Sequence, residues 1–243
     1  MKPQAGSLSR LLPVAAILVG CQCPRPPSIA KESNRPALTC DLLSAVGSRL
    51  TDPDPSTDHQ EEVLSATLLS RVPARNSSGA EQLVMVMVKQ NPYAPEEAVY
   101  ILRTPPRPLP PEYQVVHARA RQPIAFNEAS VSADFSEAAI DPSAVHALER
   151  SWGVMAREAR WPDREGEIAR MKWGGVHFTF DYRGDNVYGQ GDTVSPERGT
   201  CAASLVEIGD LLIRFVDEPD GQKRAALQLR LANESRALSE RLK

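Results

Sequence analysis

The sequence predicts an α+β fold in which amphipathic helices pack on an antiparallel sheet of about five strands. In the middle of the chain, short segments either alternate apolar with polar residues or are apolar throughout, and both patterns are typical of strands. In two later parts of the chain, apolar residues instead recur every three or four positions, which is the period of a helix with one buried face. Strands that cluster in the sequence and are followed by helices indicate an α+β architecture.

The N-terminus carries an apolar run, residues 11–20, after two basic residues, Lys2 and Arg10. A helix needs about 20 residues to cross a bilayer, so this run is too short to be a transmembrane span. A basic start followed by a short apolar run is typical of a secretory signal peptide. The run ends in Leu-Val-Gly-Cys at residues 18–21, which resembles the lipobox of bacterial lipoproteins.

This resemblance covers only residues 1–21, and it implies how the chain is processed. A signal peptidase would remove residues 1–20, the sulfur of Cys21 would receive a diacylglycerol, and the new amine would carry a fatty acyl chain such as palmitate. Several acyl chains on one residue hold a protein on a membrane far more firmly than one chain does. Because Gln22 stands where an inner-membrane lipoprotein of enteric bacteria has Asp, we expect attachment to the outer membrane, facing the periplasm.

The mature chain is predicted to consist of a tether and one globular domain. Residues 21–38 hold several prolines among polar residues, a composition that favours extended chain, and residues 39–243 suffice for a single domain. Loss of Lys2 and Arg10 takes the formal net charge from −3 to −5. No run of basic residues remains, so nucleic acid is not expected as a partner.

The cysteines fit an oxidising compartment. With Cys21 lipidated, Cys23, Cys40 and Cys201 remain, which allows three alternative disulfides. Cys23 lies in the tether, whereas Cys40 and Cys201 each open a predicted helix of the domain. We therefore expect a disulfide between Cys40 and Cys201, and two buried free thiols are the alternative.

The domain is predicted to begin with a helix over residues 40–50 and to continue in strands. Alternating apolar positions predict a strand over residues 63–72, and turn-forming residues after it predict a hairpin. The second arm of this hairpin, residues 83–88, is apolar on both faces, so we expect a central strand covered on both sides. Two further strands are predicted over residues 99–103 and 113–119.

Two stretches of this region have no predicted helix or strand. The prolines of residues 104–111 cannot donate to a sheet ladder, so this stretch is expected to be a connecting loop, with a proline-rich docking segment as the alternative. Residues 120–140 show no pattern that favours either element.

The remaining chain is predicted to be mainly helical. Asp141 is a good N-cap and Pro142 suits the first helical position, and the apolar spacing that follows predicts a helix packed on the sheet. A strand is predicted over residues 176–182, and two amphipathic helices are predicted around residues 205–215 and 227–242.

No motif in the chain identifies a reaction, and no metal site or cofactor is predicted. His177 and Asp181 share one face of a predicted strand and are candidate binding residues, but successive residues on one face lie about 6.6 Å apart, so we expect no direct contact between them. A solvated or helix-covered face is the alternative. Residues 184–192 offer oxygen ligands that suit Ca²⁺, and we favour a glycine-containing hairpin turn over a calcium loop.

Two aromatic residues, Trp161 and Trp173, lie beside charged or turn residues and are further candidates for ligand binding. The leading functional hypothesis is a non-catalytic envelope lipoprotein that binds a protein or a cell-wall partner on the periplasmic side. An envelope hydrolase with an unidentified acid/base site and an immunity-type lipoprotein are the alternatives. An enzyme should show a pocket that gathers titratable groups, whereas a binding module needs only a suitable surface patch.

Overall fold

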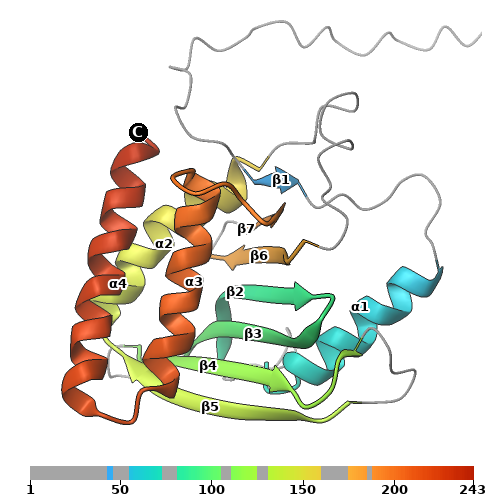
Figure 1. Ribbon diagram of the computed structural model, residues 1–243. Coiled ribbons are helices and arrows are strands. Elements are labelled where there is room, and N and C mark those ends of the chain that lie inside the picture. The colour runs from blue at the N-terminus through green and yellow to red at the C-terminus, as the bar shows by residue number, and fades with distance from the viewer. Residues whose placement is uncertain are drawn as a thin grey trace, which may run out of the picture. The chain divides into compact units, whose positions relative to one another are not determined.

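The computed structural model describes residues 43–45, 55–72, 81–104, 111–124, 131–159, 175–184 and 188–243. All of them belong to one compact unit, Ala37–Lys243. They form a single antiparallel sheet with helices on both faces, so the predicted α+β class is confirmed (Figure 1). No helix in this described part of the chain is long and apolar enough to cross a bilayer.

The strands pair in an order that differs from their order in the chain. From one edge of the sheet to the other they are β1 (Ser44–Ala45), β7 (Tyr188–Val194), β6 (His177–Arg183), β2 (Gln82–Asn91), β3 (Ala94–Arg103), β4 (Tyr113–Ala120) and β5 (Ala133–Ile140). The helices are α1 (Pro55–Leu68), α2 (Pro142–Arg157), α3 (Cys201–Asp217) and α4 (Gly221–Arg241). Six strands are long and β1 has two residues, so the sheet is larger than the predicted five strands.

The larger core lies between the sheet and the helices α2, α3 and α4. Met85 and Met87 of β2 point into it, and Trp152 of α2 packs edge-on against Phe180 of β6 with the ring centres 5.4 Å apart. The predicted apolar stripe of α2 is buried here, as is that of α3. Figure 1 shows these three helices grouped on one side of the sheet.

A smaller core occupies the opposite face of the sheet. Val86 and Val88 of β2, Tyr100 of β3 and Leu68 of α1 are buried there. Because β2 buries residues on both of its faces, the prediction of a central strand covered on both sides is confirmed.

The start of α2 is also confirmed as predicted. Asp141 is its N-cap, and the Ser143 backbone N–H donates to Asp141 Oδ1 at 2.7 Å. The hydrogen bonds from Ser143 lower the pKa of the Asp141 carboxyl below its ordinary value. The predicted strands over residues 99–103, 113–119 and 176–182 correspond to β3, β4 and β6.

Two predicted elements are wrong. Residues 63–68, expected in a strand, belong to helix α1, because Leu64 and Leu68 stand four apart and pack against the smaller core as a helical stripe. Within the predicted helix over residues 40–50, Ser44 and Ala45 instead form β1 and pair with β7. Leu43 is buried in the larger core, and the rest of that predicted helix lies outside the described residues.

Two strands have no counterpart among the predictions. β5 falls in residues 120–140, where no element was expected, and β7 replaces part of an expected loop. Gly189 and Gly191 make β7 resemble a turn in sequence, but they serve close packing. A Cβ atom on Gly189 would lie 2.7 Å from the backbone carbon of Ala156 in α2, and one on Gly191 would lie 2.7 Å from Cβ of Leu43.

Candidate functional site

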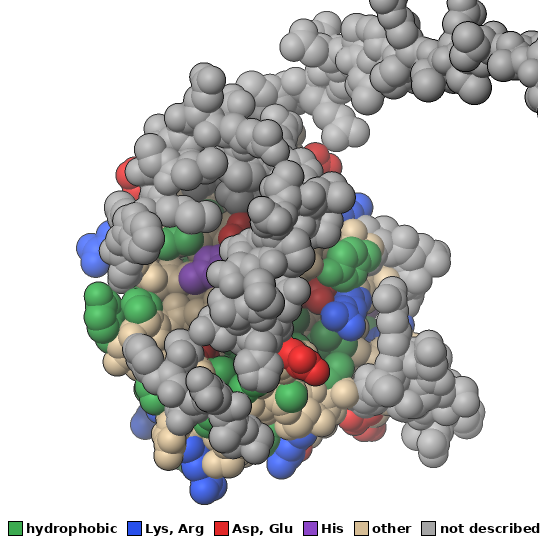
Figure 2. Space-filling model, turned by 90° about the vertical axis from the view of Figure 1, so that its right-hand side faces the viewer, with side chains coloured by type: hydrophobic (Ala, Val, Ile, Leu, Met, Phe, Trp, Pro, Cys, Tyr) green, Lys and Arg blue, Asp and Glu red, His purple; other side chains and the backbone are tan. Residues whose placement is uncertain are grey.

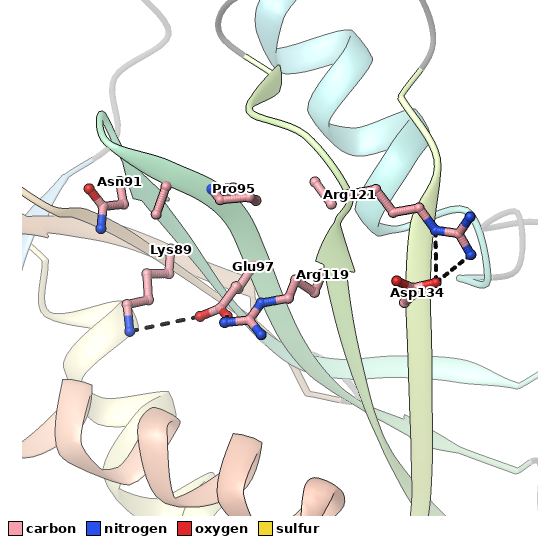
Figure 3. A pocket seen from close by; sticks show the side chains of 9 residues that line it. Lys89, Asn91, Pro95, Glu97, Arg119, Arg121 and Asp134 are labelled. Carbon is pink, nitrogen blue, oxygen red and sulfur yellow. Dashed lines mark hydrogen bonds and ion pairs between the residues drawn. The ribbon is translucent and has the colours of Figure 1, made fainter.

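A charged recess lies on the face of the sheet that carries α3, beside that helix. Its volume is about 480 Å³. The described residues that line it are Lys89, Asn91, Ala94, Pro95, Glu97, Arg119, Ala120, Arg121 and Asp134, from strands β2 to β5 and the segment after β4 (Figure 3). Side chains alternate between the two faces along a strand, so Lys89 lies on the same face of β2 as Met85 and Met87. Lys89 also forms an ion pair with Asp210 of α3, which assigns the recess to the face that carries α3.

Four of these residues form a row across neighbouring strands, which we call the charge ladder: Lys89, Glu97, Arg119 and Asp134. In the strand register, Lys89 lies opposite Glu97, Glu97 opposite Arg119, and Arg119 opposite Asp134. The charges therefore alternate in sign from β2 to β5. Opposite charges in directly facing positions stabilise a sheet, so the ladder has a structural role as well as any binding role.

The ladder is held by short ion pairs. Lys89 Nζ lies 3.8 Å from Glu97 Oε2 and 3.3 Å from Asp210 Oδ1. Arg119 Nη2 lies 2.7 Å from Glu97 Oε1. Next to the ladder, Arg121 donates from Nε and Nη2 to a single oxygen of Asp134, Oδ1, at 2.9 and 2.6 Å. This hydrogen bonding raises the pKa of the Arg121 guanidinium above its ordinary value.

The ladder is covered at one end and open at the other. The Glu97 side chain is 12% exposed and Lys89 26%, because α3 lies over that end. Arg119 is 65% exposed, Arg121 61% and Asp134 66%. A ligand that enters the recess therefore meets two guanidinium groups and one carboxylate.

An exposed aromatic residue lies in the turn next to the recess. Tyr93 lies in the turn between β2 and β3, and its side chain is 84% exposed. The residues that flank this turn, Asn91 at the end of β2 and Ala94 at the start of β3, line the recess. The Tyr93 backbone N–H donates to Asn91 Oδ1 at 3.0 Å, which fixes the turn locally. Sequence reasoning missed this aromatic residue.

The predicted candidates His177 and Asp181 lie apart from the recess, on the opposite face of the sheet, and have separate partners. His177 Nδ1 lies 2.9 Å from Gln90 Oε1, and Nε2 lies 2.8 Å from Asp192 Oδ2. Asp181 accepts hydrogen bonds from Arg183 at 3.0 and 2.9 Å. Since both ring nitrogens of His177 are engaged, the side chain ties β2, β6 and β7 together.

Another histidine, His117, is buried on β4. Its Nδ1 lies 3.1 Å from Asp217 Oδ1 at the end of α3, and its Nε2 has no hydrogen-bond partner in the described part of the chain. This contact fastens the end of α3 to the sheet. No group of three His, Cys, Asp or Glu side chains suited to a metal ion occurs among the described residues.

Several predicted residues cannot be placed. Cys21, Cys40, Trp161 and Trp173 lie outside the described residues, so the lipidation, the disulfide and the tryptophan sites stay predictions. Cys201 opens α3 and is fully buried. In residues 184–192, where we favoured a hairpin turn over a calcium loop, Gly189, Gly191 and Asp192 belong to β7, which pairs antiparallel with β6.

Figure 2 shows one face of the molecule with its described side chains coloured by type. Acidic and basic side chains lie interspersed on it, and those of one sign do not gather into a single patch. Comparison of the whole chain with family models, with curated proteins and with solved structures found no match.

Proposed function

We propose that this chain is a lipid-anchored protein of the bacterial cell envelope, and that its globular domain binds a cell-wall or protein partner through the charged recess. The anchor follows from the lipobox-like residues 18–21 and the apolar run before them. The recess is the observation that carries the binding function. It combines a concave surface with charged side chains that are covered at one end and exposed at the other, and the adjoining β2–β3 turn carries the exposed Tyr93.

The residues of the recess favour binding over catalysis. Among the described residues that line it there is no Ser, Thr, Cys or His, so it offers neither a side-chain nucleophile of those types nor an imidazole base. Its two carboxylates, Glu97 and Asp134, already accept hydrogen bonds or ion pairs from arginine. Outside the recess, His177 has both ring nitrogens engaged, and this weighs against the hydrolase alternative.

Site-specific cross-linking tests the proposed binding site. A photoreactive amino acid is introduced at Tyr93 in the full chain, expressed in a bacterium that lipidates it. The matched control is the same substitution at Leu229, which is 63% exposed on α4, a helix that packs against α2 and α3. We expect cross-links to a wall or envelope component from position 93 and not from position 229.

Equal cross-linking from both positions, or none from position 93, would contradict the proposal. Digestion of the adduct with a wall-degrading enzyme and with a protease then identifies which partner is attached. The cell wall and a protein are thereby distinguished in one sample.

A further inference from the structure

We propose that the recess recognises a free carboxylate of a short cell-wall peptide, and that Arg119 and Arg121 bind this carboxylate. The inference rests on the proposed binding function and adds the chemical class of the ligand. It depends on three features of the recess: unused donors, the balance of exposed charge, and size.

The two arginines keep hydrogen-bond donors for a ligand. A guanidinium has five N–H donors. Arg121 uses two of its nitrogens on one oxygen of Asp134, and Arg119 pairs with Glu97 through Nη2. The two residues are separated by one position at the end of β4 and both line the recess. Figure 3 shows Arg119 turned toward Glu97 and Arg121 turned toward Asp134. Residues so spaced on an extended chain have Cα atoms about 6.6 Å apart, so to hold one carboxylate between them the two flexible side chains must turn toward each other.

The exposed charges favour an anion. At the covered end of the ladder, Lys89 lies between Glu97 and Asp210, and these charges compensate one another under α3. At the open end, Arg119 and Arg121 are both largely exposed, whereas Asp134 is the one exposed carboxylate of the lining. A ligand carboxylate is therefore attracted to the open end, and Asp134 competes with it for Arg121.

The size of the recess favours the end of a small peptide. A volume of about 480 Å³ lies within the range of small-ligand pockets, which is about 300 to 1,000 Å³. To bind a folded protein, this domain would need a flatter and larger surface than the recess offers. Ala94 and Pro95 supply apolar contacts, and the exposed Tyr93 lies in the turn just before them. In the periplasm, peptides of the cell wall present free carboxylates of this kind.

Fluorescence anisotropy with dye-labelled tetrapeptides tests the inference on the full chain in detergent. One peptide has the D-residues of a wall peptide and a free C-terminal carboxylate. The second is its C-terminal amide, and the third is an all-L peptide of the same length. We expect the free carboxylate to bind at least about tenfold more tightly than the amide, the effect of losing one charge-assisted contact.

Three variants separate recognition from structural support. Arg119→Gln should weaken binding of the free carboxylate about tenfold. Asp134→Asn should strengthen it, because the competing anion is gone. Arg230→Gln, which removes an exposed arginine paired with Glu234 on α4, should change nothing. A purely structural ladder predicts that Arg119→Gln and Asp134→Asn both weaken binding.

Equal affinities for the carboxylate and the amide peptides, or no binding of either, would overturn the inference. If cross-linking at Tyr93 persists in that case, the recess still binds a partner and only the ligand class is wrong. Preference for the all-L peptide would assign the carboxylate to a protein C-terminus and overturn the cell-wall source. Loss of the Tyr93 cross-link would instead contradict the proposed function itself.

Discussion

The close approach of α2 to β7 makes Gly189→Ala the most informative stability variant. A Cβ atom at this position would lie 2.7 Å from the carbonyl carbon of Ala156, 2.8 Å from its oxygen and 2.8 Å from the backbone nitrogen of Arg157. All three are backbone atoms of the last turn of α2. They cannot move away alone, because Trp152 and Met155 of the same helix are fully buried in the larger core.

The expected cost follows from this rigidity. Overpacking of a well-packed core typically costs about 1 to 3 kcal/mol, and a clash with helix backbone belongs at the upper end, about 3 kcal/mol. For a domain of this size that loss corresponds to a decrease in Tm of about 6 to 12 °C. Urea denaturation followed by tryptophan fluorescence measures it, with an unchanged m-value as the sign that the unfolding reaction is the same.

Gly221→Ala is the matched control. Gly221 is the first residue of α4, and a Cβ atom there meets no atom within 4 Å. We expect this variant to unfold within about 0.5 kcal/mol of the parent or to be slightly more stable. A Gly189→Ala variant as stable as the control would refute the packing of α2 on β7.

Further variants test three separate parts of the fold. Tyr100 is fully buried and its hydroxyl has no partner in the described part of the chain, so Tyr100→Phe should leave stability unchanged or raise it by about 1 kcal/mol in thermal melts. Burial raises the pKa of Tyr100 to about 12. The folded state then keeps a proton that the unfolded chain releases above pH 10, so the free energy of unfolding should fall between about pH 10 and 12. In Tyr100→Phe this fall should be smaller. Identical profiles of stability against alkaline pH for the two proteins would contradict this reasoning. Asp141→Ala should destabilise α2 at neutral pH. Because the pKa of Asp141 is lowered in the folded state, its contribution is present above the ordinary carboxyl pKa and should disappear in acid melts as the carboxylate is protonated. If Cys40 and Cys201 form the predicted disulfide, Cys40→Ser and Cys201→Ser should each cost about 2 to 4 kcal/mol and the double variant no more, whereas additive losses would exclude the pairing.

The sequence was sufficient for elements whose local pattern agrees with their environment. The uninterrupted apolar run of β2 predicted a strand buried on both faces, and Met87 and Val88 do point into different cores. The Asp141 cap and the three- and four-residue spacing after it predicted α2. In these cases propensity, spacing and burial all favour the same structure.

Elements whose form depends on distant residues were not predictable. Gly189 and Gly191 indicate a turn when considered alone, and they form a strand because α2 and Leu43 occupy the space that side chains would fill. Leu64 and Leu68 fit both a strand and a helix, and packing on the smaller core decides for the helix. Tertiary contacts therefore override local preference at these positions.

The recess could not be predicted from the sequence for a related reason. Lys89, Glu97, Arg119 and Asp134 are spread over 46 residues, and only the register of four strands brings them into one row. The one local signal was a charged residue near the end of each strand. His177 was recognised as a polar group on a strand face, but its partner Asp192 comes from a strand that was not predicted.

The proposed compartment, oxidising environment and partner all depend on the proposed lipid anchor, so the anchor is the central claim to test. The most direct measurement is the intact mass of the chain purified from a bacterial membrane fraction. We expect a chain that begins at Cys21 and carries the mass of a diacylglycerol and an acyl group. An unacylated chain that retains residues 1–20 would contradict the lipid anchor, and with it the proposed cell-wall ligand.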